Sequence, residues 1–140
     1  MGTPSVEGPD TARLFRVANG VMFVLFGYSM VVQHNDPDAA NWMAAYGVAA
    51  ILCLSAVLER PRWKLSGLLA GISGVSAAVI APEVPAGQGL VDSEAGRELM
   101  GMILVCLWTA LLTWWWHGHP ALEPAPRQGP PRQGPPPSSP

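Results

Sequence analysis

Four stretches of the 140-residue chain contain no Asp, Glu, Lys or Arg. They comprise residues 17–32, 42–58, 65–81 and 99–116. A transmembrane helix needs about 20 mostly apolar residues, so each stretch spans a bilayer once a turn of flanking residues joins it. None alternates like a membrane strand, and backbone groups in lipid must be hydrogen-bonded internally, which favours helices. The sequence therefore predicts an all-α membrane protein, a four-transmembrane-helix up-down bundle.

The composition excludes several other classes of protein. Charged residues make up 13% of the chain, which is about half of the usual share in soluble domains. Two cysteines are too few for a disulfide scaffold. Eight basic residues against ten acidic ones give a net charge of −2, which argues against a nucleic-acid binder.

Basic residues are distributed unevenly between the two sides of the predicted bundle. One side would carry Arg13, Arg16, Arg60, Arg62, Lys64, Arg127 and Arg132, and the other side only Arg97. The positive-inside rule then predicts that the N- and C-termini are both cytoplasmic. Trp42 at one interface and Trp63 at the other fit the aromatic belts of a membrane protein. We expect the cytoplasmic (plasma) membrane as the location.

The chain divides into three parts. Residues 1–16 form a cytoplasmic N-terminal segment, residues 17–116 the transmembrane domain, and residues 117–140 a Pro-rich cytoplasmic tail. Within the tail, residues 127–131 repeat as residues 132–136. The tail cannot bury apolar area, so we expect it to be disordered.

Gly67, Gly71 and Gly74 share one face of the third predicted helix. Small residues at this spacing let two helices approach closely. The face would serve either packing inside the bundle or a homo-oligomer. Beyond the lipid bilayer, the sequence indicates no specific protein partner.

The first polar motif follows the first stretch. It contains Gln33, Asn35, Asp36 and Asp38, and Trp42 and Tyr46 come one and two turns later. Asp36 before a proline predicts a helix start, with Asp38 in the first turn, where the helix dipole favours negative charge. Asp38, Trp42 and Tyr46 then share one helical face.

The second polar motif precedes the fourth stretch. Glu94, Arg97, Glu98 and Gly101 would lie along one side of that helix. Gly101 leaves room for a large neighbour such as Tyr46 or Trp42. Arg97 is a natural ion-pair partner for Asp36 or Asp38.

Other polar residues have structural interpretations. Asn19 is expected to hydrogen-bond between helices, and Cys53 and Cys106 to be buried thiols rather than a redox pair. The acidic loops could attract a divalent cation, but capping and ion pairing also explain them, so we assign no metal site. The sequence identifies no cofactor.

The two motifs resemble signatures of the transmembrane protein 220 family. Gln33, Asn35, Asp36, Asp38, Trp42 and Tyr46 match Q-x-N-D-P-D-A…W…Y, and Glu94, Gly96, Arg97, Glu98 and Gly101 match E-x-G-R-E-x-x-G. The resemblance covers about residues 15–116. It implies a small multi-helix membrane protein, and it implies no particular reaction.

The leading hypothesis is a non-enzymatic protein that binds a small ligand or lipid, or serves as an accessory subunit. The candidate outer cluster comprises Gln33, Asn35, Asp36, Asp38, Trp42, Tyr46, Glu94, Arg97 and Glu98. One alternative is an oligomeric transporter or channel-like protein. Another is a membrane enzyme that uses the outer carboxylates as acid and base.

Overall fold

The fold is given by a computed structural model that describes residues 9–35, 38–60 and 62–118. Its long helices are α1 (Pro9–Val32), α2 (Ala39–Val57), α3 (Trp63–Ile80) and α4 (Glu94–Gly118). The short 3-10 helices η1 (Gln33–Asn35) and η2 (Ala81–Glu83) follow α1 and α3. All four long helices are long and apolar enough to cross a membrane, and the described ranges contain no strand. The predicted fold class, a four-helix all-α membrane protein, is confirmed.

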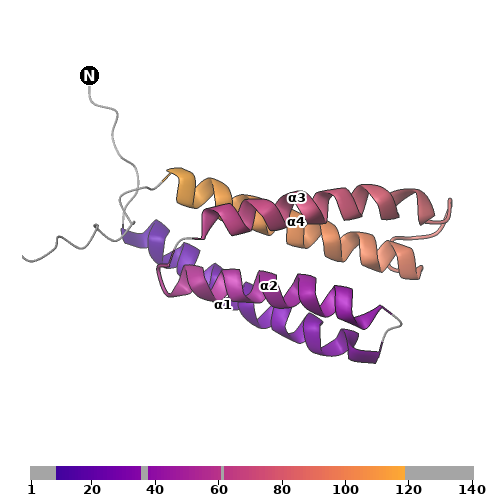
Figure 1. Cartoon of the computed structure of the whole chain (residues 1–140), viewed down its shortest axis with the longest axis horizontal. Helices are drawn as coiled ribbons and strands as arrows, with labels where there is room; N and C mark the ends of the chain where they lie inside the picture. Colours follow the sequence, from indigo (N-terminus) through magenta and orange to yellow (C-terminus); the bar gives the residue numbers. More distant parts are fainter. Residues whose placement is uncertain (1–8, 36–37, 61, 119–140) are drawn as a thin grey trace, which may run out of the picture.

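The helices form two antiparallel hairpins (Figure 1). α1 packs along α2, and α3 packs along α4, whereas the hairpins meet mainly through α2. One end of the bundle carries η1 and residues 81–93, and we call it the loop end. The other, the terminal end, carries the start of α1 and the end of α4. This is the predicted up-down order of helices.

α1 extends further into polar sequence than the charge-free stretch indicates. It begins at Pro9, eight residues before the predicted span at position 17. The extra turns have a packing partner, because the ring of Phe15 stacks on Trp115 of α4 with centroids 4.1 Å apart. Phe15 also meets Trp116 edge-on. Aromatic contacts between the two hairpins therefore support the helix beyond its apolar stretch.

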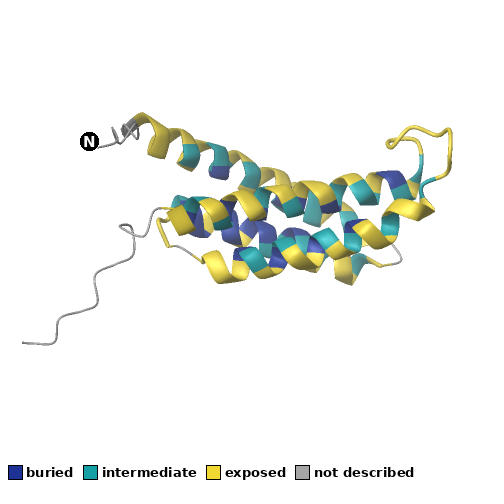
Figure 2. Ribbon diagram, turned by 90° about the horizontal axis from the view of Figure 1, so that it is seen from above, coloured by how far each residue is buried: buried dark blue, intermediate teal, exposed yellow. Residues whose placement is uncertain are grey.

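Few residues of the bundle are fully buried (Figure 2). The buried core is partly polar, and many large apolar side chains are exposed. Asn19 and Thr109 are fully buried, whereas Val24 and Leu107 are 66% and 65% exposed. Large apolar side chains exposed on every helix would be unfavourable in water. In a bilayer they face lipid, and the buried Asn19 and Thr109 side chains hydrogen-bond within the bundle. The burial pattern thus agrees with the hydropathy of the helices.

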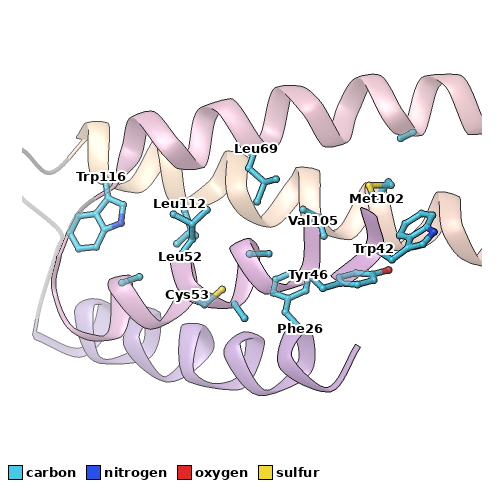
Figure 3. Close-up of a cluster of buried hydrophobic side chains, with 14 residues drawn as sticks. Phe26, Trp42, Tyr46, Leu52, Cys53, Leu69, Met102, Val105, Leu112 and Trp116 are labelled. Carbon is cyan, nitrogen blue, oxygen red and sulfur yellow. The ribbon is translucent and has the colours of Figure 1, made fainter. Parts of the chain in front are cut away.

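Buried apolar side chains run along the bundle (Figure 3). They extend from Trp116 near the terminal end to Trp42 and Met102 near the loop end. Cys53 lies in this row and is a buried free thiol, and Cys106 is a half-buried free thiol. The expected burial therefore holds for Cys53, whereas Cys106 is only partly buried.

The end of α2 is closed by a Schellman motif. Arg60 N donates to Ser55 O at 2.8 Å, and Glu59 N donates to Ala56 O at 3.1 Å. Glu59 adopts a φ of 56°, a left-handed conformation that usually favours glycine. Its carboxylate forms an ion pair with Arg16 of α1. This pair ties α1 to the link between the hairpins.

Candidate functional site at the loop end

The two polar motifs meet at the loop end. Gln33 and Asn35 lie in η1, and Trp42 and Tyr46 lie in the first turns of α2. Glu94, Arg97 and Glu98 lie in the first turns of α4. Asp36 falls outside the described residues. The other members of the predicted cluster are therefore brought to the same end of the bundle, although they do not form one site there.

Tyr46 is the centre of the aromatic part of this region. It is buried, and its ring lies beside those of Trp42 and Phe26, with centroids 6.1 and 6.3 Å away. The Gln33 side chain lies within hydrogen-bonding reach of the Tyr46 hydroxyl, and Glu98 is close enough to act on it electrostatically. Tyr46 thus links η1, α2 and α4.

The Tyr46 hydroxyl occupies the space beside Gly101. A Cβ built at Gly101 would overlap this hydroxyl. The expectation that Gly101 makes room for a large aromatic neighbour is confirmed, and the neighbour is Tyr46. The last glycine of the second motif therefore has a packing role.

Asp38 has a different position from the one predicted. α2 begins at Ala39, so Asp38 stands at the N-cap, whereas the sequence predicted that role for Asp36. The Asp38 carbonyl accepts from Asn41 N at 3.0 Å, but its carboxylate makes no capping hydrogen bond. Capping therefore does not account for this exposed carboxylate.

Arg97 holds the loop in place and does not pair with Asp38. Its guanidinium donates to Val91 O at 3.3 Å, six residues earlier in the chain. No ion pair joins Arg97 to Asp38, and both side chains are described. Of the two expected pairs, the one with Asp38 does not form, and the one with Asp36 lies outside the described residues. The backbone carbonyl that Arg97 contacts instead has no sequence signature.

The start of α4 is fixed by two further residues of the second motif region. The Ser93 hydroxyl caps the helix by accepting from Gly96 N at 3.1 Å. A Cβ at Gly96 would overlap the carbonyl of Leu90. Gly96 thus allows residues 81–93 to fold back onto α4.

A groove of about 530 Å³ opens between the hairpins, next to this region. Its charged lining residues are Asp38 and Glu98, at the starts of α2 and α4. Its apolar walls come from α2, α3 and α4 and include Trp42, Ala45, Val48, Leu69, Ile72, Ile80 and Met102. Val48 lies ten residues after Asp38, so the groove extends about 15 Å along α2 at 1.5 Å per residue. This is about half of the hydrocarbon thickness of a bilayer.

Ser73 is the unusual polar residue of this groove. It is 1% exposed, and its hydroxyl is the one buried side-chain oxygen or nitrogen in the described ranges without a hydrogen-bond partner. Ser76 and Asn41 also line the groove. Sequence reasoning missed all three, because a serine in an apolar helix is typical of close packing. For the two serines of α3, the available signal was their spacing with Leu69 and Ile80 on one helical face.

The glycine face of α3 is turned toward α4 of the same chain at two of its three positions. A Cβ at Gly67 would meet Thr113, and one at Gly74 would meet Cys106, at 3.5 and 3.4 Å. Gly71 has open space beside it. These contacts fit the interpretation that the face packs inside the bundle.

The described residues contain no group of three or more His, Cys, Asp or Glu side chains arranged to hold a metal ion. His117 meets Trp63 edge-on, with ring centroids 5.7 Å apart, at the terminal end. His119 lies outside the described ranges.

Four apolar helices in two hairpins, with polar motifs at one end, define a polytopic α-helical membrane protein. Comparison with known proteins makes this more specific. The family described as "Transmembrane family 220, helix" matches residues 22–114, and the chain belongs to this family. The match includes both motifs, the second and third membrane-spanning segments, and most of the fourth, and it begins within the first.

A relative from Xenopus laevis, Transmembrane protein 220, is 31% identical over 107 residues. The alignment covers 71% of this chain, and the chain spans 58% of the length of that relative. No solved structure is similar at a significant level.

Proposed function

We propose that the chain binds an amphiphilic small molecule in the groove between its hairpins, with the polar head of the molecule at the loop end. The observation that carries this proposal is the lining of the groove, which has two carboxylates toward the loop end and mostly apolar side chains along its length. Ligand sites are concave, mostly apolar and equipped with a few convergent polar groups. This groove has that composition and a volume of about 530 Å³.

The charge at the mouth favours a cationic head. Asp38 and Glu98 are the charged residues that line the groove, and both are acidic. A protonated amine or a quaternary ammonium placed there gains Coulomb energy that increases as water is excluded. Trp42 adds an aromatic ring in the wall, which also suits such a head.

The apolar walls favour a hydrocarbon chain. Val48, Leu69 and Ile72 flank the deeper part of the groove. The groove spans about half of the bilayer thickness, which matches an amphiphile residing in one leaflet. An amine with a hydrocarbon chain therefore fits both the acidic mouth and the apolar walls of the groove.

Contacts around the mouth separate structural residues from candidate binding residues. Gly96, Arg97 and Gly101 are accounted for by packing and by the Val91 hydrogen bond. Asp38 makes no capping bond and lines the groove. This difference supports a binding role for Asp38 and a structural role for Arg97, whereas Glu98 enters the proposal because it lines the groove.

The test is native mass spectrometry of the full chain in mild detergent with two probes, a long-chain primary alkylamine and the alcohol of the same chain length. We expect the amine to be retained over the alcohol. Asp38→Asn and Glu98→Gln should each lower amine retention about tenfold, equivalent to about 1.4 kcal/mol. Glu94→Gln is the matched control, because Glu94 is an exposed carboxylate of the same helix start that does not line the groove.

Equal retention of amine and alcohol by the wild type would overturn the proposal. So would a loss in Glu94→Gln as large as that in Asp38→Asn. Thermal melting of each variant establishes that the bundle is folded.

We further infer that the loop end faces away from the cytoplasm, with both termini inside. The uneven distribution of Arg and Lys supports this orientation. In a chain with Cys53 and Cys106 replaced, a single cysteine at Gln88 should react with an impermeant maleimide in intact cells. Labelling that requires permeabilised cells would contradict the orientation.

A further inference from the structure

We infer that the occupant of this groove is a zwitterionic glycerophospholipid with an amine head, and that the Ser73 hydroxyl donates to one of its ester carbonyls. The inference rests on the proposed function and specifies the class of amphiphile. It starts from the orphaned hydroxyl of Ser73.

Hydroxyls in helices usually bond back to a carbonyl of the preceding turn. Thr109 does so with Val105 O at 2.7 Å, and Ser55 does so with Leu52 O at 2.7 Å. Ser73 has no such bond, although it is equally buried. Among the buried polar groups of the helices, it alone is left with an unused donor next to a groove. An acceptor supplied by an occupant would satisfy it.

The depth of Ser73 limits where that acceptor lies on the occupant. Ile80 ends α3 and lines the groove, and Ser73 precedes it by seven residues. At 1.5 Å per residue, Ser73 is about 10 Å below the loop end of α3. Ser76 lies on the same wall, about 6 Å below that end.

With the amine of the occupant placed level with the loop end of α3, an acceptor about 10 Å below it distinguishes among amphiphiles. A simple alkylamine has no acceptor at that depth, and an amino alcohol of the sphingoid type carries its hydroxyls beside the amine. In an amine-headed glycerophospholipid, nine bonds separate the nitrogen from the ester carbonyl carbon. An extended chain advances about 3.5 Å per three bonds, so this separation is about 10 Å.

The phosphate of such a lipid also has a hydrogen-bond donor at the matching depth of the groove. The phosphodiester of such a lipid lies between its amine and its esters, near the level of Ser76, whose hydroxyl can donate to it. The amine then lies between the phosphate and the carboxylates of Asp38 and Glu98. The order of polar groups down the groove therefore matches the order of groups along the lipid.

The test compares two probes on the full chain in mild detergent by native mass spectrometry. One is a diacyl phosphatidylethanolamine, and the other is its dialkyl ether analogue, which lacks ester carbonyls and keeps the head and chains. We expect the wild type to retain the diester about fivefold better, the contribution of one hydrogen bond. Ser73→Ala should retain the two probes equally. Ser66→Ala is the matched control, because Ser66 is a buried serine of α3 that does not line the groove.

Three outcomes overturn the inference. They are equal retention of ester and ether by the wild type, a preference for the ester that persists in Ser73→Ala, and loss of that preference in Ser66→Ala. If alkylamine binding still depends on Asp38, any of these outcomes contradicts only the contact between Ser73 and the ester. The proposed amine site is then retained. Retention of neither phospholipid nor alkylamine overturns both proposals together.

Discussion

Trp108 Nε1 donates a hydrogen bond to Asn19 Oδ1 at 3.3 Å and so joins α4 to α1. Asn19 is fully buried, and its Nδ2 donates to Phe15 O at 2.9 Å. The expectation that Asn19 bonds between helices is confirmed, and its partner is the one tryptophan in the middle of a span. Because α1 and α4 belong to different hairpins, this bond helps to hold the hairpins together.

Disrupting this bond should weaken the bundle. Asn19→Leu and Trp108→Phe should each lower the free energy of unfolding by about 1 kcal/mol, since interhelical hydrogen bonds in membranes contribute about 0.6 and at most about 1.7 kcal/mol. Unfolding by a denaturing detergent in mixed micelles measures this. The double variant should lose less than the sum of the two changes. Strictly additive losses would mean that the two side chains do not interact.

The contact of Tyr46 with Gly101 should make alanine costly at position 101. Gly101→Ala should lower the free energy of unfolding by about 1–3 kcal/mol, because the added Cβ overlaps the tyrosine hydroxyl. Tyr46→Phe removes that hydroxyl and should restore part of the loss in the double variant. Gly20→Ala is the control, as nothing lies within 4 Å of its added Cβ. A control variant that melts as early as Gly101→Ala would refute the steric argument.

Two substitutions at Glu59 separate the cost of its left-handed backbone conformation from the contribution of its ion pair with Arg16. Glu59→Ala keeps the strained backbone and loses the ion pair with Arg16. Glu59→Gly loses the same ion pair but relieves a backbone cost of about 1 kcal/mol. Both side chains are about half exposed, at 53% and 56%, so the pair itself contributes at most about 1 kcal/mol. Glu59→Gly should therefore melt near the wild type and above Glu59→Ala. Because both variants lose the ion pair, Glu59→Gly melting at or below Glu59→Ala would contradict the backbone cost.

Ser73→Ala should separate stability from binding. Removing a buried hydroxyl without a partner should leave the free energy of unfolding unchanged or raise it by up to about 1 kcal/mol. Thr109→Ala, which deletes a hydroxyl that bonds to Val105 O, is the comparison and should lower it by about 1 kcal/mol. The measurement is detergent-induced unfolding without added lipid. A clear loss of stability in Ser73→Ala would mean that its hydroxyl has a structural partner.

The long apolar stretches predict the helices well, because absence of charge over a bilayer thickness has few other solutions. Their ends are harder to predict. α1 continues to Pro9, and its added turns contain Phe15, which stacks on Trp115, a residue 100 positions later in the chain. α2 starts at Ala39, although Asp36 before a proline is the stronger local signal. Tertiary contacts, which a single sequence does not display, decide such boundaries.

The candidate site was predicted in part. The size relation between Gly101 and Tyr46 could be inferred, since a missing side chain implies a large neighbour. The hydrogen bond from Arg97 to Val91 O could not be inferred, because every residue has a backbone carbonyl and nothing in the sequence marks this one. The groove could not either, since it depends on how far α2 and α3 lie apart. Asp38 was predicted in the first turn of the helix, where the dipole favours its charge, whereas it stands at the N-cap without a side-chain capping bond.

The division into hairpins has a consequence for how the polypeptide can be assembled. Each hairpin satisfies most of its helix contacts internally, and only a short link joins Val57 to Trp63. A gene cut at this link would encode two fragments, each a self-contained pair of crossing segments that enters the bilayer as a unit. Co-expressed fragments should recombine through the Asn19–Trp108 bond and the Phe15–Trp115 stack, so that the protein behaves as a covalently tethered heterodimer of helical pairs.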